Sequence, residues 1–198
     1  VLSQKGISVF GNHKVNLITR GIVGSISLIL FFYTLQRIPL ASAVTMQYLS
    51  PIFTTILGVF ILKEKVKPIQ FLYFAMAFAG VLIIQGVDAR VDPVSAVMGV
   101  VSGLSAGLAY NMIRKLKTSE HPLVIVFYFP LVTLPIASII MYFDWVTPIG
   151  WDWVILLWIG FCTQSAQYFM TVAYQTGNLA RVSSISYMSV LYALIFGF

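Results

Sequence analysis

Long apolar stretches separated by short polar stretches make up most of the chain. The apolar stretches cover residues 21–36, 40–62, 68–87, 94–113, 122–143, 152–176 and 179–198. About 20 apolar residues, each rising 1.5 Å along a helix, cross the hydrocarbon core of a bilayer. Because backbone groups in lipid must be hydrogen-bonded within their own segment, each stretch is predicted to be a helix. The pattern predicts an all-α, polytopic membrane protein, a bundle of seven spans.

Prolines mark the ends of these stretches. Most of the eight prolines lie in connections or at first-turn positions, where the missing N–H costs nothing. Pro51, Pro130 and Pro135 instead fall inside stretches, where each permits a kink. Residues 1–20 are mixed and polar, and they are predicted to form a cytoplasmic loop.

The composition excludes a water-soluble globule. The chain is 59% hydrophobic and 9% charged, whereas about 25% of the residues of a soluble domain are charged. The net charge of +6 does not indicate nucleic-acid binding, because basic residues gather in alternate loops. With residues 1–20 inside the cell, ten of the 12 Lys and Arg residues fall inside, and only Arg37 and Arg90 fall outside. This asymmetry predicts the orientation in the bacterial inner membrane.

Several features have structural explanations. Gly99, Gly103 and Gly107 repeat every four residues and are predicted to let another helix approach closely. Aromatic residues cluster near the outer ends of the fifth and sixth stretches, where amphipathic rings anchor a protein at the membrane interface; they are Tyr142, Trp145, Trp151 and Trp153.

No ionisable side chain is predicted to lie deep in any stretch. The sequence also lacks a carboxylate pair, a nucleophile beside a base, a glycine-rich phosphate loop and a Cys/His metal spacing. We therefore predict no catalytic residues, no metal site, no cofactor and no enzyme activity. A third, less favoured possibility, a membrane enzyme, would need catalytic residues beyond this chain.

The polar residues within the stretches are uncharged. Gln164, Tyr168, Thr171 and Gln175 follow one another at i, i+4, i+7 and i+11, which places them on one helix face. Such a face either lines a solute cavity or supplies hydrogen bonds between helices, and the sequence leaves both explanations open. The candidate solute-binding residues are Gln36, Gln47, Tyr48, Tyr110, Asn111, Gln164, Tyr168, Gln175 and Tyr187.

An internal repeat relates the two ends of the chain. Residues 21–59 align without a gap on 160–198, with identities that include Gln36 with Gln175 and Tyr48 with Tyr187. The first and sixth stretches are five spans apart, so the two copies cross the membrane in opposite directions. Inverted repeats are typical of secondary transporters, whose solute site lies near the midplane between the halves.

The same region resembles a known family. Arg20-Gly21, the Leu40-Ala41-Ser42-Ala43 start, Pro51-Ile52-Phe53, Glu64 and Gly80-Val81-Leu82 resemble an EamA domain of the drug/metabolite transporter superfamily. The resemblance implies ten spans in two inverted five-helix halves, of which this chain holds spans three to nine. It therefore implies a first repeat ending in 21–87 and a second, truncated repeat in 94–198.

Together these observations predict a carrier for a small polar or amphipathic solute, amino-acid-like or similar, that works by alternating access. Its expected partners are that solute and the lipid bilayer, without nucleic acid; the oligomeric state is left open. The alternative is a membrane interaction or scaffold subunit that transports nothing. Convergence of Gln36, Gln47 and Gln164 on one cavity would favour the carrier.

Overall fold

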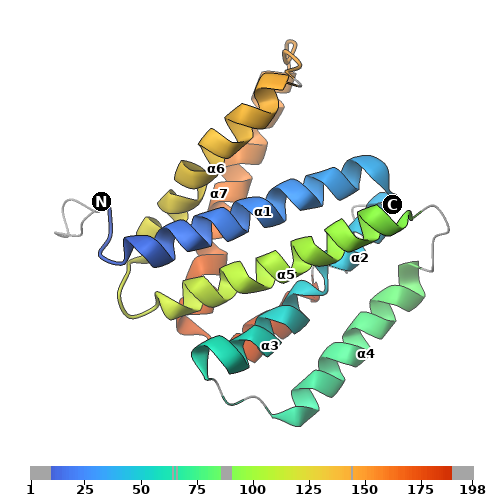
Figure 1. Ribbon diagram of the computed structural model, residues 1–198, viewed down its shortest axis with the longest axis vertical. Coiled ribbons are helices and arrows are strands. Elements are labelled where there is room, and N and C mark those ends of the chain that lie inside the picture. Colours follow the sequence, from blue (N-terminus) through green and yellow to red (C-terminus); the bar gives the residue numbers. More distant parts are fainter. Residues whose placement is uncertain (1–9, 64, 66, 86–90, 144, 189–198) are drawn as a thin grey trace.

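The computed structural model describes residues 10–63, 65, 67–85, 91–143 and 145–188. Helices account for all the regular structure in these residues, which confirms the all-α class (Figure 1). In chain order they are α1 (Lys14–Arg37), α2 (Leu40–Gln47), α3 (Ser50–Leu62), α4 (Pro68–Gln85), α5 (Pro93–Lys115), α6 (Pro122–Phe143), α7 (Asp152–Thr176) and α8 (Leu179–Ile185).

The second apolar stretch is divided into two helices. α2 ends at Gln47, and the N–H groups of Tyr48 and Leu49 donate to carbonyls three residues back. Pro51 follows in the first turn of α3, where its missing N–H is tolerated. The single span predicted for residues 40–62 is therefore two helical segments with a break near their middle.

The expected cytoplasmic loop is shorter than predicted. α1 begins at Lys14, so residues 14–20 are helical rather than part of the loop. Burial of an apolar side chain explains the difference, because Leu17 is fully enclosed in a cluster with residues of α5, α6 and α7. A helical turn is difficult to predict in a mainly polar segment when only one of its side chains faces the core.

α5 lies at the centre of the bundle. It runs antiparallel to α1, because Leu17 packs with Ile113 while the Ser27 hydroxyl donates to the Ser102 carbonyl. It runs parallel to α2 and α3: a Cβ on Gly99 would meet Met46, and one on Gly107 would meet Phe53 and the backbone of Thr54. The glycine ridge thus lets two helices approach closely, as predicted.

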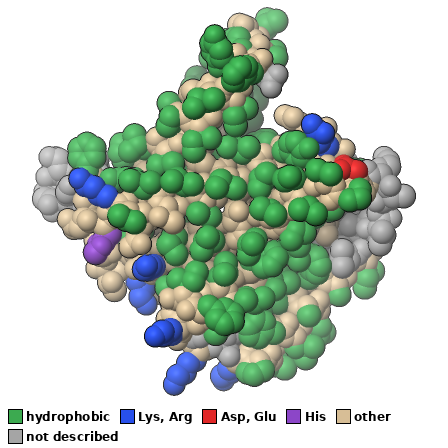
Figure 2. All heavy atoms as spheres, in the orientation of Figure 1, with side chains coloured by type: hydrophobic (Ala, Val, Ile, Leu, Met, Phe, Trp, Pro, Cys, Tyr) green, Lys and Arg blue, Asp and Glu red, His purple; other side chains and the backbone are tan. Residues whose placement is uncertain are grey.

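This arrangement places the start of α1 and the ends of α3 and α5 at one end of the bundle. We call it the basic end, because Lys14, Lys63 and Lys115 mark those three helix termini. Figure 2 shows most of the blue side chains along the left and lower left of the view, and a further one at the upper right, with hydrophobic side chains covering the helices between the ends. That the basic end faces the cytoplasm stays a prediction.

Within the described part of the chain, four segments are long and apolar enough to cross a membrane: Lys14–Arg37, Ser42–Leu62, Pro93–Lys115 and Pro122–Phe143. The other predicted spans are also helical where the structure describes them, in α4, α7 and α8. The last ten residues of the seventh stretch lie outside the described residues. The fold is therefore a helical membrane bundle.

Helix boundaries fall in the register of the predicted repeat. The Tyr187 hydroxyl donates to the carbonyl of its aligned partner Tyr48, a separation of 139 residues. The same separation relates the ends of α1 and α7, at Arg37 and Thr176, and the starts of α2 and α8. The division into two EamA repeats stays a prediction, but α7 and α8 reproduce the helix boundaries of α1 and α2.

Candidate functional site

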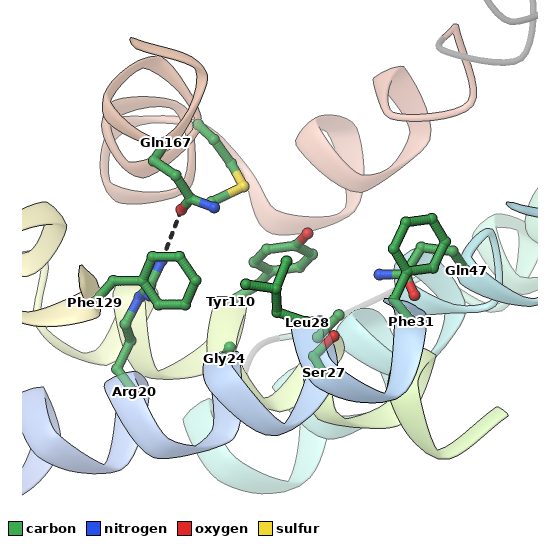
Figure 3. Close-up of a pocket in the computed structure, with 12 residues that line it drawn as sticks. Arg20, Gly24, Ser27, Leu28, Phe31, Gln47, Tyr110, Phe129 and Gln167 are labelled. Atoms are coloured by element: carbon green, nitrogen blue, oxygen red, sulfur yellow. Dashed lines mark hydrogen bonds between the residues drawn. The ribbon is translucent and has the colours of Figure 1, made fainter. Parts of the chain in front are cut away.

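A pocket of about 180 Å³ lies between α1, α5 and α7, with contributions from α2 and α6. Its lining combines amide, hydroxyl, aromatic and guanidinium groups, and Figure 3 shows them facing one another from these helices. The lining residues are Arg20, Gly24, Ser27, Leu28, Phe31, Gln47, Ala106, Ala109, Tyr110, Phe129, Gln167 and Met170.

Arg20 is the charged residue of this lining. It lies six residues, or roughly 9 Å, into α1, and its side chain is 2% exposed. This corrects the expectation that no ionisable side chain lies deep in a helix. The residue had been assigned to the loop because it immediately precedes the first apolar stretch. Its partners Phe129 and Gln167 lie more than 100 residues later in the chain, so no local sequence signal could have revealed its burial.

Arg20 reaches across the pocket toward α6 and α7 (Figure 3). Its Nη2 donates to Gln167 Oε1 at 2.8 Å, and its guanidinium carbon lies 4.4 Å from the centre of the Phe129 ring. A Cβ at Gly24 would lie 3.2 Å from Nη1, so the glycine leaves room for the guanidinium. Among the described residues, neither Nε nor Nη1 has a hydrogen-bond partner.

A second polar group lies farther along α1. Ser27 and Ser102 bond reciprocally through hydroxyl and carbonyl groups, at 2.9 and 2.8 Å. The Ser102 hydroxyl also lies 3.0 Å from Gln47 Oε1. Gln47 occupies the last turn of α2, next to the break before α3, so the break brings an amide side chain into the pocket.

An apolar cluster closes the pocket toward the basic end. Two lining residues, Tyr110 and Met170, pack against it, and its own members come from the next turns of α1, α5, α6 and α7. These members are at most 5% exposed: Leu17, Ile113, Leu116, Val124, Ile125, Tyr128 and Tyr174. The Tyr110 and Tyr174 rings stack with centres 4.7 Å apart. A solute in the pocket is therefore separated from the basic end by packed side chains.

Charged side chains reinforce this closure. Glu120, between α5 and α6, accepts hydrogen bonds from the N–H groups of Asn12 and His13 at 2.5 and 2.6 Å, just before α1 begins. Arg114 donates to the carbonyls of Tyr174 and Gly177 at the end of α7. A negative side chain thus binds a helix start and a positive one binds a helix end, as the helix dipoles favour.

Two of the nine predicted residues, Gln47 and Tyr110, line the pocket. Asn111 is adjacent but buried in a helix contact, where its Nδ2 donates to the carbonyls of Thr54 and Gly107. Tyr48 and Tyr187 stack on each other with ring centres 6.0 Å apart. The structure therefore brings these last two together without placing them in the pocket lining.

The predicted glutamine pair does not converge. Gln36 is exposed near the end of α1, whereas Gln175 donates to the Glu120 carbonyl at the basic end. Helices of an inverted repeat run in opposite directions, so residues near their C-termini lie at opposite ends of the bundle rather than in its centre. The expectation that this pair approaches one central volume is corrected.

The predicted polar face of α7 is rotated from the face that lines the pocket. Gln164 is exposed, Tyr168 is half-buried outside the lining, and Gln167 and Met170 face the pocket instead. Thr171 and Tyr174 continue that inward face at helical spacing and are buried. Spacing identified the correct helix, but several glutamines close in sequence left its rotation undetermined.

The described residues contain no group of three or more His, Cys, Asp or Glu side chains placed to hold a metal ion. The chemistry that the pocket offers is hydrogen bonding, stacking and one positive charge.

Residues 2–86 match the model of the EamA-like transporter family. Over these residues the chain is similar to that family. The pseudopaline exporter CntI of Pseudomonas aeruginosa is 28% identical to this chain over 97% of the chain and 68% of the exporter's own length. Solute carrier family 35 member G1 of Homo sapiens is 27% identical over 92% of the chain and 54% of its own length.

A solved crystal structure shares the fold of this chain, with a TM-score of 0.75 and 20% identity over the whole chain and 72% of the other one. The protein is thus an integral membrane transporter of the bacterial inner-membrane type, and its relatives are transporters rather than enzymes. A small-molecule solute and membrane lipid are its partners.

Proposed function

We propose that this protein carries a small polar or amphipathic solute, amino-acid-like or similar, through the pocket between α1, α5 and α7 by alternating access. The observation that supports this most directly is the pocket itself: polar and aromatic groups line it, and a packed cluster closes it at one end. Amides and hydroxyls bind polar groups of a solute, while Tyr110 and Phe129 offer ring faces.

The repeat supports a mechanism in which two similar halves rock about the pocket. α7 and α8 repeat the boundaries of α1 and α2, and the aligned residues Tyr48 and Tyr187 touch. Aligned residues that contact each other lie near a two-fold axis. We assign residues 21–87 and 94–198 to the two EamA repeats on this basis, with solute bound between them.

Truncation of Gln167 tests the pocket. Gln167→Ala in the full-length carrier removes an amide that faces the cavity, whereas Gln164→Ala removes an exposed amide one turn earlier on α7. Loss of one hydrogen bond to solute costs about 1–3 kcal/mol, or roughly a five- to 150-fold loss of affinity. Transport of a panel of radiolabelled amino acids into vesicles is measured per molecule of carrier, alongside thermal stability.

We expect Gln167→Ala to lower transport and Gln164→Ala to leave it unchanged. Gln164, which the sequence pattern placed in the cavity, therefore serves as the matched control. Unchanged activity in Gln167→Ala with lowered stability would show that the amide only joins α1 to α7, which favours the scaffold alternative. Transport of neutral sugars but of no amino acid would reject the proposed solute class.

A further inference from the structure

Arg20 carries a positive charge that the described part of the protein does not neutralise. The residues described in the pocket lining include no Asp or Glu, and the one hydrogen bond to the guanidinium comes from a neutral amide. A buried charge without a partner is unfavourable by several kcal/mol in an effective protein environment. The Phe129 ring offsets part of this cost, since a cation over an aromatic face gains about 0.5–2 kcal/mol.

The unused hydrogen-bond donors indicate what would complete the site. A guanidinium has five N–H donors in a fixed planar fork, and here Nη2 alone has a partner among the described residues. Nε–H, both N–H groups of Nη1 and the second N–H group of Nη2 remain, so that second group still forms an edge of two free donors with Nη1 or with Nε. This geometry suits the two oxygens of a carboxylate, which arginine binds in pairs with charge-assisted hydrogen bonds.

The surroundings of Arg20 also limit the size and shape of the anion. The cavity volume of about 180 Å³ exceeds the roughly 150 Å³ of an apolar cavity that admits benzene. Phe129 and Tyr110 present ring surfaces beside the guanidinium, and the missing side chain of Gly24 leaves room for Nη1 itself. A carboxylate attached to a small ring or side chain therefore fits both the charge and the room available.

We propose that Arg20 binds the carboxylate of the transported solute, so that the carrier selects small organic acids and zwitterions over their neutral analogues. Gln167 accepts one N–H of Nη2, and the second N–H of Nη2 is left, with its neighbour on the fork, for the anion. The inference rests on the proposed function, because it uses the same pocket as the solute site.

Benzoate and benzamide form a matched pair of probes, since they have nearly the same shape and only benzoate is charged. Binding of each to the purified full-length carrier is measured by the rise in its unfolding temperature at millimolar probe concentrations. Arg20→Gln removes the charge, and Arg20→Lys keeps the charge but loses the fork. Arg37→Gln is the control, because Arg37 is on the same helix and lies 4.3 Å over the Tyr33 ring, but is exposed.

We expect the wild-type carrier to bind benzoate at least tenfold more tightly than benzamide. Arg20→Gln should abolish that preference, Arg20→Lys should retain part of it, and Arg37→Gln should leave it intact. Equal binding of both probes by the wild type, or an undiminished preference in Arg20→Gln, would overturn the carboxylate site while leaving the pocket as a solute site. Binding of neither probe would reject both.

Unfolding of Arg20→Gln without any probe is measured separately. If that variant does not fold, Gly24→Val serves in its place, because a larger side chain at Gly24 would press on Nη1 and Phe129 without removing the charge. Gly24→Val should then bind benzoate at least tenfold more weakly than the wild type does. Retention of the full benzoate preference by Gly24→Val would contradict the site.

Discussion

The basic end and the opposite end of the bundle are held together in different ways. At the basic end, hydrogen bonds join residues that are far apart in sequence: Glu120 binds the backbone 107 and 108 residues earlier, and Arg114 binds the backbone 60 residues later. At the opposite end, Asp92, Trp145 and Asp152 bond to residues two or three positions away.

The difference shows which contacts can hold the helices of the bundle together. A local bond completes one helix end or turn but leaves neighbouring helices free to separate. A long-range bond links one helix to another and so resists opening of the basic end, whereas the bonds named at the opposite end, among the described residues, do not link helices in this way. In alternating access one end of the pocket must be closed while the other opens, and the described conformation has its firm closure at the basic end.

Of the substitutions considered, Glu120→Ala is expected to lower the stability of the protein most, because it weakens the basic end. It removes an acceptor of two backbone N–H groups, and hydrogen bonds to a charged group contribute about 1.5–3 kcal/mol each. We expect the free energy of unfolding of the purified carrier to fall by about 3 kcal/mol. Ser119→Ala is the control, since its hydroxyl makes one long bond of 3.4 Å to Leu116. Equal stability of the two variants would contradict a special role for the long-range bonds.

Gly107→Ala tests whether close helix packing, rather than polar bonds alone, fixes α5. The new Cβ would lie 2.9 Å from Phe53 Cβ and 2.9 Å from the Thr54 nitrogen, a backbone atom that cannot move aside cheaply. Overpacking of this kind destabilises by about 1–3 kcal/mol. Gly160→Ala on α7 is the matched control, because no atom lies within 4 Å of its Cβ. It should be neutral or slightly stabilising, since alanine favours a helix. The unfolding temperatures of both variants, measured in a thermal scan, test this expectation, and equal values would contradict it.

Asp92→Ala should have the smallest effect, because the bond it removes is local and exposed. The Ser95 side chain, followed by its backbone N–H, lowers the pKa of the Asp92 carboxyl below 3.8. A lowered pKa means that the carboxylate stabilises the folded state above about pH 4 and loses this contribution as the pH falls through the folded-state value. Unfolding temperatures of wild type and Asp92→Ala should differ slightly at pH 7, and the difference should shrink as the pH falls through the lowered folded-state pKa of Asp92. A constant difference across that range would show that ionisation of Asp92 plays no part.

The sequence predicted the helices well because membrane spans depend on composition and length, which are local properties. It also predicted the contact of α5 with another helix through the glycine ridge, because small residues at a four-residue spacing have few other uses in a membrane helix. Pro51 indicated a kink in the second stretch. The full break between α2 and α3 was not predicted, because residues 40–62 were expected to form one helix.

The pocket was predicted less well, because its lining depends on how helices are rotated against one another. Gln164 and Gln167 are equally polar, and only the packing of Thr171 and Tyr174 decides which of them faces inward. Arg20 was missed because its burial comes from α6 and α7, more than a hundred residues later. No local pattern distinguishes an arginine that ends a loop from one that enters a pocket.

The charged contacts of Arg114, in the last turn of α5, and of Glu120, just after it, also constrain the order in which these contacts can form during synthesis. Glu120 reaches its partners at residues 12 and 13 once α5 has been made, but Arg114 has to wait for residues 174 and 177. A ribosome adds those last residues several seconds later, at about 5–20 residues per second. Until then the site around Arg20 lacks Gln167 and its closure at the basic end. The nascent chain therefore passes through a stage in which Arg20 is already in the membrane but has neither its amide partner nor the packed side chains that close the pocket.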